Sequence, residues 1–139
     1  MRMNAELLFR VQFLQKQAEE LEQNLEIVER ELIDLKGLDT NLDFLTKSND
    51  KSSISAIGKG LHIKTNIESK ELFVEVGAGV VVKKSPEQAR TIINNQIRKL
   101  TEAKIQMLGK LDIYHKTIES VVQEIEQEEK NAHEGHNHN

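Results

Sequence analysis

The sequence predicts an α+β fold that is mainly helical, with a long antiparallel coiled coil of two helices and two β-hairpins between them. Apolar residues recur at alternating spacings of four and three in the first and last thirds of the chain, and the spacing changes to two in the middle. The 139 residues include one Pro and no Trp, and 30% are charged while only 4% are aromatic. This composition is typical of long helices rather than of a compact globule.

The first helix is expected over residues 1–46. Its seam, the line of a and d positions that faces the partner helix, runs from Leu7 to Leu35 without a break. A sustained spacing of 3.5 residues is typical of a left-handed coiled coil. The seam residues are Leu7, Val11, Leu14, Ala18, Leu21, Leu25, Val28, Leu32 and Leu35. The apolar spacing stops at Asp39, and a polar linker is expected over residues 47–53.

Residues 54–84 are expected to form two β-hairpins. Apolar and polar residues alternate there, as in strands that are buried on one face. The segments "IGKGLHIK" (57–64) and "VGAGVVVK" (76–83) repeat one pattern, in which a Gly-x-Gly lies between two strand-like runs. Each Gly-x-Gly therefore predicts a tight turn or a bulge.

Four short strands leave open edges that need partners, so we expect the hairpins to pair with other subunits. The alternative is a sheet that is internal to a monomer. The side chains predicted to take part in subunit assembly are Ile54, Leu61, Ile63, Ile67, Leu72, Val74, Val76, Val80 and Val82.

The second helix is expected over residues 85–130. Ser85 suits the N-cap, Pro86 suits the first helical position, and Gln88 is placed to complete a capping box. Its seam is apolar except at one lysine, and comprises Ile93, Ile97, Leu100, Lys104, Met107, Leu111, Tyr114, Ile118, Val121 and Ile125.

The two seams can pair in antiparallel register, with Leu7 near Ile125 and Leu35 near Ile97. This register places Lys104 opposite Val28. Two interpretations of this lysine stay open. Lys104 could fix the register of the coiled coil, or its ammonium could extend past Val28 towards water.

Leu8, Phe9 and Phe13 lie outside the seam. Phe9 and Phe13 are four residues apart and fall at positions f and c, which point away from a two-helix seam. Together with Leu8 they predict an exposed apolar patch near the ends of both helices. The alternatives are a wide core face or a packing contact with a neighbouring coiled coil.

Several function classes are disfavoured. The net charge of −4 argues against a nucleic-acid binder, and the absence of cysteine removes disulfide and thiol chemistry. No signal peptide or membrane span is recognisable, so we expect a soluble, cytoplasmic protein. The Gly-x-Gly pairs lack the Lys-Ser/Thr of a phosphate loop. No catalytic constellation emerges, so we expect neither an enzyme nor a cofactor.

The segments "SAIGKGLHIK" and "FVEVGAGVVVKKSPEQA", with the heptads on either side, resemble the alpha-type subunit of archaeal prefoldin. The resemblance covers nearly the whole chain apart from the last dozen residues. The two hairpin units favour the alpha type, because beta-type subunits carry only one. The resemblance implies a hexamer of two alpha and four beta subunits, whose hairpins build a β-barrel body from which six coiled coils extend.

The resemblance also implies an ATP-independent chaperone that binds non-native client proteins at the coiled-coil tips and passes them to a group II chaperonin. The expected client-binding residues are Leu7, Leu8, Phe9, Val11, Phe13, Leu14, Ile118, Val121, Val122 and Ile125. A structural coiled-coil protein is the alternative, either a filament-forming relative of the alpha subunit or an adaptor with a prefoldin-like hairpin.

The tail, residues 131–139, is expected to be disordered. Its His133, His136 and His138, with Glu134, carry donor atoms that Zn, Ni or Cu accept, although their spacing matches no defined site. We therefore expect no metal centre there, and metal binding by the tail remains the alternative.

Overall fold

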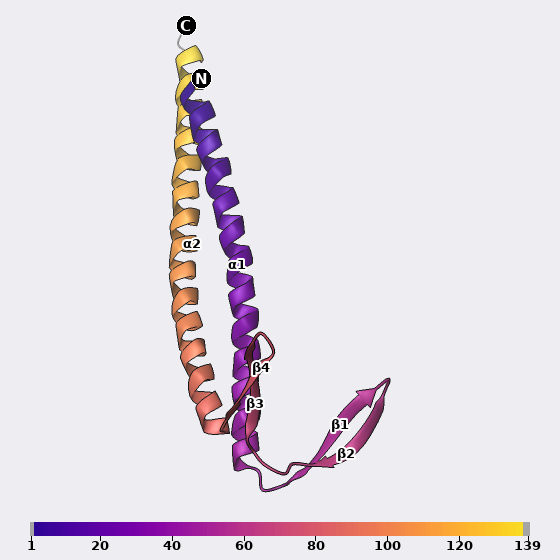
Figure 1. Ribbon diagram of the computed structural model, residues 1–139. Coiled ribbons are helices and arrows are strands. Elements are labelled where there is room, and N and C mark those ends of the chain that lie inside the picture. The colour runs from indigo at the N-terminus through magenta and orange to yellow at the C-terminus, as the bar shows by residue number, and fades with distance from the viewer. Residues whose placement is uncertain (1, 138–139) are drawn as a thin grey trace. The chain divides into compact units, whose positions relative to one another are not determined.

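The computed structural model describes the backbone of residues 2–137 and the side chains of residues 5–133 (Figure 1). The elements follow one another as α1 (Arg2–Lys47), β1 (Ser52–Gly58), β2 (Leu61–Asn66), β3 (Leu72–Gly77), β4 (Val80–Lys84) and α2 (Pro86–Asn137). The predicted fold class, two long helices with two antiparallel strand pairs between them, is confirmed.

The chain consists of two compact units, and each helix contributes to both. The first, the coiled-coil unit, comprises Met1–Glu31 and Leu100–Asn139. The second, the hairpin unit, comprises Leu32–Lys99.

In the coiled-coil unit, Val11 of α1 is buried against Val121 and Ile125 of α2. Leu7 and Ile118 are partly buried and pack against the same cluster. Residues near the start of α1 thus contact residues near the end of α2, so the two helices are antiparallel, and Leu7 lies in the cluster with Ile125 as the seam counts predict.

Ion pairs elsewhere in this unit agree with the same register. Lys104 Nζ lies 3.6 Å from Glu29 Oε1, and His115 Nε2 lies 3.4 Å from Glu22 Oε1. Glu29 follows Val28, so the side chain of Lys104 extends past its seam partner to reach a carboxylate on the flank of α1. The ammonium ends at a carboxylate of the partner helix rather than in water, so the two interpretations of Lys104 both stay open.

In the hairpin unit, the helix packing continues beyond the predicted end of the seam. Leu42 of α1 and Ile93 of α2 are buried. Asp39 and Arg90 hold the positions that keep the spacing of four and three on the two helices. The interpretation that the seam stops at Asp39 was wrong, because an ion pair takes the place of an apolar contact there.

The strands form two separate antiparallel pairs, β1 with β2 and β3 with β4. Each pair has an irregular register just before its turn, between Ala56 and Gly58 and between Glu75 and Gly77. The central residues of both turns have positive φ, 47° and 81° at Lys59 and Gly60, and 51° and 75° at Ala78 and Gly79. Positive φ at both central positions is the signature of a type I′ turn, so each Gly-x-Gly forms the predicted tight turn.

A reciprocal pair of hydrogen bonds starts α2. The amide of Gln88 donates to Ser85 Oγ at 3.1 Å, and the amide of Ser85 donates to Gln88 Oε1 at 3.0 Å. Two of the amides left unpaired at a helix start are thereby satisfied. The predicted capping box is confirmed.

The C-terminal end differs from the expectation of disorder from residue 131. α2 continues to Asn137, seven residues beyond its predicted end at 130. Residues 128–132 include Glu, Lys and Ala, which favour helix, and adding a turn to a formed helix avoids the cost of nucleation. Of the tail residues that carry metal-binding donor atoms, Glu134, His136 and His138 have side chains outside the described residues.

Candidate functional site

An apolar surface lies near the start of α1. It consists of Leu8, Phe9 and Phe13, which we call the α1 surface, with exposed fractions of 51%, 73% and 56%. Phe9 and Phe13 are one helical turn apart and therefore neighbours on the helix surface. Burying a side chain of this size contributes about 1.5–3 kcal/mol, so the α1 surface can supply several kcal/mol to a partner that covers it.

The structure divides the residues predicted to bind clients into two groups. Leu8, Phe9, Phe13 and Val122 are exposed. The others occupy the seam: Val11, Val121 and Ile125 are buried, and Leu7, Leu14 and Ile118 are partly buried. Because the seam residues already fill one another's packing positions, they hold the helices together and are not free for a client in this state.

The residues predicted for subunit assembly also fall into two groups. Ile54, Leu61, Ile63, Val76 and Val80 are exposed, whereas Ile67, Leu72, Val74 and Val82 are partly buried. The structure brings Val74 opposite Val82 in the β3–β4 pair. Each described sheet has only two strands, so every one of these strands has one unpaired edge. Unpaired edges beside exposed apolar side chains are typical of surfaces that accept another strand.

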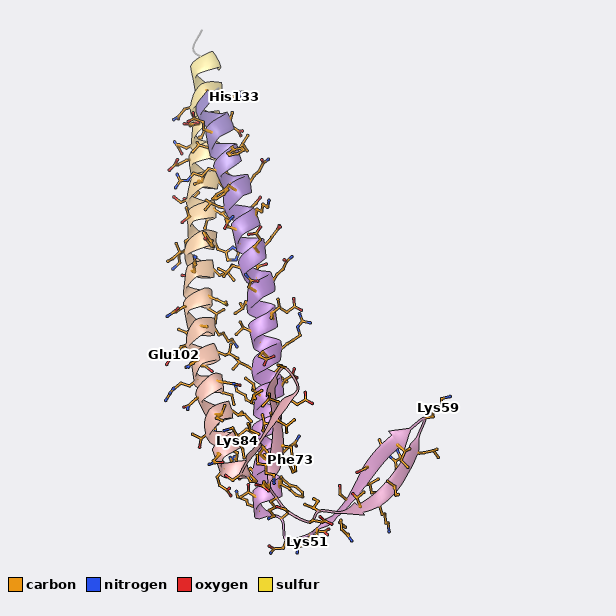
Figure 2. The ribbon with its side chains drawn as sticks, in the orientation of Figure 1. Lys51, Lys59, Phe73, Lys84, Glu102 and His133 are labelled. Carbon is orange, nitrogen blue, oxygen red and sulfur yellow. The ribbon has the colours of Figure 1, made fainter. Side chains whose placement is uncertain are left out.

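Sequence reasoning missed exposed apolar residues on the hairpins, among them Phe73 and Val81. Phe73 alternates with Leu72 and Val74, so it lies on the opposite face of β3. Its ring has Lys83 Nζ 5.7 Å from its centroid (Figure 2 labels Phe73). The available signal was the run "LFVEV", in which apolar residues occupy both phases of the alternation.

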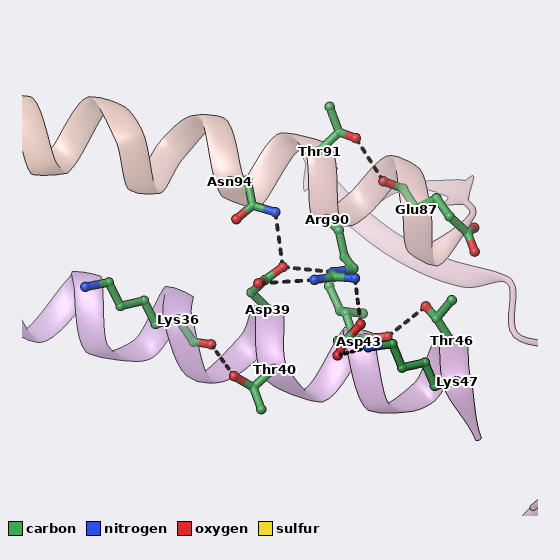
Figure 3. Close-up of polar contacts among 11 residues, drawn as sticks. Lys36, Asp39, Thr40, Asp43, Thr46, Lys47, Glu87, Arg90, Thr91 and Asn94 are labelled. Atoms are coloured by element: carbon green, nitrogen blue, oxygen red, sulfur yellow. Dashed lines mark hydrogen bonds and ion pairs between the residues drawn. The ribbon is translucent and has the colours of Figure 1, made fainter.

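A polar cluster joins α1 and α2 within the hairpin unit (Figure 3). Arg90 Nε donates to Asp39 Oδ1 at 3.0 Å, and Arg90 Nη1 donates to Asp43 Oδ1 at 2.9 Å. Asn94 Nδ2 donates to Asp39 Oδ1 at 3.2 Å. The hydrogen bond from Arg90 is the main reason that the pKa of Asp39 lies below its ordinary value. The same bond raises the pKa of Arg90. These groups bond one another across α1 and α2, so the cluster is a polar contact between the two helices.

Comparison with known proteins identifies the family of this chain. A family model described as Prefoldin subunit matches residues 14–131. This chain belongs to the prefoldin family. Prefoldin subunits are generally chaperones and are not known as enzymes.

Similar prefoldin sequences come from archaea. The chain is 26% identical over 123 residues to Prefoldin subunit alpha of Methanobrevibacter smithii, which covers 88% of this chain and 84% of that protein. It is 30% identical over 122 residues to Prefoldin subunit alpha of Archaeoglobus fulgidus, which covers 85% of each.

Among solved structures, one similar chain comes from the cryo-EM structure of filamentous PFD from Methanocaldococcus jannaschii. The alignment covers 86% of the present chain and 95% of the Methanocaldococcus jannaschii chain. The match has a TM-score of 0.47 and 18% sequence identity.

In the part of the chain that the structure describes, no helix is long and apolar enough to cross a membrane.

Proposed function

We propose that this prefoldin chain is an alpha-type subunit of a cytoplasmic holdase, which binds non-native proteins without ATP and passes them to a group II chaperonin. The observation that carries the proposal is the exposure of Phe9 and Phe13 beside a seam that is already filled. A filled seam leaves these rings no partner in the described part of the coiled-coil unit, so they are available to another protein.

The chemistry of the α1 surface suits a client that is not folded. Non-native chains expose apolar side chains, and the hydrophobic effect rewards their burial without requiring a particular geometry. Phe and Leu on a helix can therefore contact clients of unrelated sequence. The described Gly-x-Gly segments form type I′ turns, whereas phosphate loops place their glycines at a helix N-terminus.

Assembly with beta-type prefoldin subunits, in the ratio of two alpha to four beta, would place two α1 surfaces in one particle. The unpaired edges of β1–β2 and β3–β4 support strand pairing between subunits. Several weak apolar contacts on one client add up through effective concentration. A modest surface on each subunit is then sufficient to hold a client.

The test is the suppression of client aggregation by a complex reconstituted with a beta-type subunit. Changing Phe9→Ser and Phe13→Ser together should abolish most of the protection contributed by this chain. A matched control changes Ile27→Ser and Ile33→Ser, which are also exposed on α1 but lie outside the α1 surface. We expect the control complex to protect as well as the wild type. Full protection by the double Phe variant in an intact complex would overturn the proposal.

Two further measurements test the assembly and the transfer. Size-exclusion chromatography with light scattering, with and without a beta-type subunit, should give a mixed complex of defined mass. Open-ended self-assembly of this chain alone would instead favour the structural, filament-forming alternative. Adding a group II chaperonin and ATP to the complex with a bound client should restore client activity, and no transfer would remove that part of the proposal.

A further inference from the structure

The β1–β2 hairpin carries positive charge that nothing in its own sequence balances. Residues 52–66 contain Lys59, Lys64 and His62 but no Asp or Glu. Among the described residues, neither Lys59 nor Lys64 forms an ion pair. Four lysines elsewhere in the described part of the chain, Lys47, Lys83, Lys104 and Lys116, each lie within 4.0 Å of a carboxylate oxygen.

The charged groups lie among the exposed apolar side chains of this hairpin. Lys64 of β2 is the cross-strand partner of Ile54 of β1, and His62 is the partner of Ala56. Cross-strand partners share one face of a sheet, so Lys64 and His62 lie beside Ile54 and Ala56. Lys59 is a central residue of the turn and lies at the tip of the hairpin (Figure 2). Any chain that covers Ile54 must therefore also meet Lys64.

The positive charge of the β1–β2 hairpin favours some binding partners over others. A second copy of this hairpin would bring the same uncompensated lysines, because it has the same sequence. Neighbouring strands lie about 4.8 Å apart, which is shorter than the Debye length of about 10 Å at 0.1 M salt, so charges on two paired hairpins act on each other. Like charges across an interface suppress association, whereas opposite charges speed and tighten it.

We propose that the β1–β2 hairpin takes as its partner a strand of a different chain, in which apolar residues alternate with Asp or Glu. Lys59 and Lys64 then select this acidic partner and disfavour a second copy. The inference rests on the proposed assembly through strands and adds to it the chemistry of the partner.

The second hairpin lacks this signature. β3–β4 contains Glu75 as well as Lys83 and Lys84. Lys83 Nζ also lies 4.0 Å from Glu71 Oε2 and near the ring of Phe73. Its charges are mixed and partly satisfied within the chain, so the selection by charge belongs to β1–β2.

The experiment measures the affinity of this chain for a beta-type prefoldin subunit at about 50 mM salt, where screening is weak. The test variant combines Lys59→Glu with Lys64→Glu. The control combines Lys99→Glu with Lys110→Glu, two exposed lysines of α2 whose replacement changes the net charge by the same amount. Circular dichroism checks that both variants keep the helical content of the wild type.

We expect the test variant to bind about tenfold more weakly or more slowly than the wild type, the loss to shrink at 500 mM salt, and the control to bind like the wild type. A complex whose affinity changes by less than twofold in the test variant would overturn the inference while leaving the proposed function intact. Equal losses in both variants would also overturn it, because the effect would then come from net charge alone.

Failure to form a complex with the beta-type subunit would count against the proposed function. Mixing two forms of this chain tests the selection of an acidic partner even in that case. The test variant supplies an acidic hairpin on the same backbone. Light scattering of an equal mixture of wild type and test variant should show more association than either alone. Association of wild type alone as strong as that of the mixture would overturn the inference.

Discussion

Arg90 of α2 holds both carboxylate oxygens of Asp39 of α1, with Nε 3.0 Å from Oδ1 and Nη2 3.5 Å from Oδ2. Both residues occupy seam positions, where a coiled coil normally places apolar side chains. A charged pair at a seam disfavours other registers, because a shifted helix would leave one charge without its partner. We therefore expect the pair to help fix the helix alignment in the hairpin unit.

Replacing Asp39→Asn should destabilise the protein at pH 7, and the difference from the wild type should shrink as the pH falls below about 4. The pKa of Asp39 is lowered in the folded state by the hydrogen bond from Arg90. Its stabilising contribution is present above the unfolded pKa of about 3.9 and is lost as the pH falls through the lower folded value. Urea unfolding followed by circular dichroism at pH 7, 5, 4 and 3 measures this. A difference that stays constant over this range would contradict the role of the ion pair.

Replacing Ser85→Ala should lower the free energy of unfolding by about 1 kcal/mol, the usual cost of losing an N-cap oxygen. The reason is that the amide of Gln88 loses its acceptor at the start of α2. Ser85→Asp keeps an oxygen in the same place and should stay close to the wild type. Thermal and urea unfolding of both variants provide the comparison. An alanine variant as stable as the aspartate variant would show that the capping box contributes little.

Replacing Ile125→Ala should cost about 2–5 kcal/mol, because it opens a cavity in a packed core. Ile125 is buried against Val11 and Val121. Ile113→Ala, at an exposed position of the same helix, should stay within about 0.5 kcal/mol of the wild type. The pair of variants thus compares the same chemical change inside and outside the seam. Equal losses at the two positions would contradict the packing of the coiled-coil unit.

Periodicity was enough to predict the helices, their antiparallel register and the two hairpins. The spacing of apolar residues marks the seam of each helix, and the contact of Val11 with Val121 and Ile125 follows from counting along the two seams. The capping box was predictable because its hydrogen bonds join residues three apart in sequence. A tight turn at each Gly-x-Gly was predictable because Gly60 and Gly79 tolerate positive φ, whereas the positive φ of Lys59 and Ala78, which makes the turns type I′, was not predicted.

The interhelical polar cluster was not predicted, because Asp39 and Arg90 are far apart in sequence and each alone reads as the end of an apolar pattern. Extending both seams by their regular spacing would have placed Asp39 opposite Ile93 and Leu42 opposite Arg90, with the opposite charges of Asp39 and Arg90 at neighbouring seam positions. The candidate client surface was predicted too broadly for a related reason. A sequence marks Val121 and Phe9 alike as apolar, and only the packed structure shows that the first is 2% exposed and the second 73%.

The central claim is that the α1 surface contacts non-native proteins, and site-specific photo-crosslinking tests it most directly. A benzoylphenylalanine replaces Phe9 in one variant and Ile33 in a control variant, at a position that is 69% exposed on the same helix. Each variant, assembled with a beta-type subunit, is irradiated in the presence of an unfolded client. We predict a strong client adduct at position 9 and little at position 33. Equal yields at both positions, or no adduct at position 9, would contradict the claim.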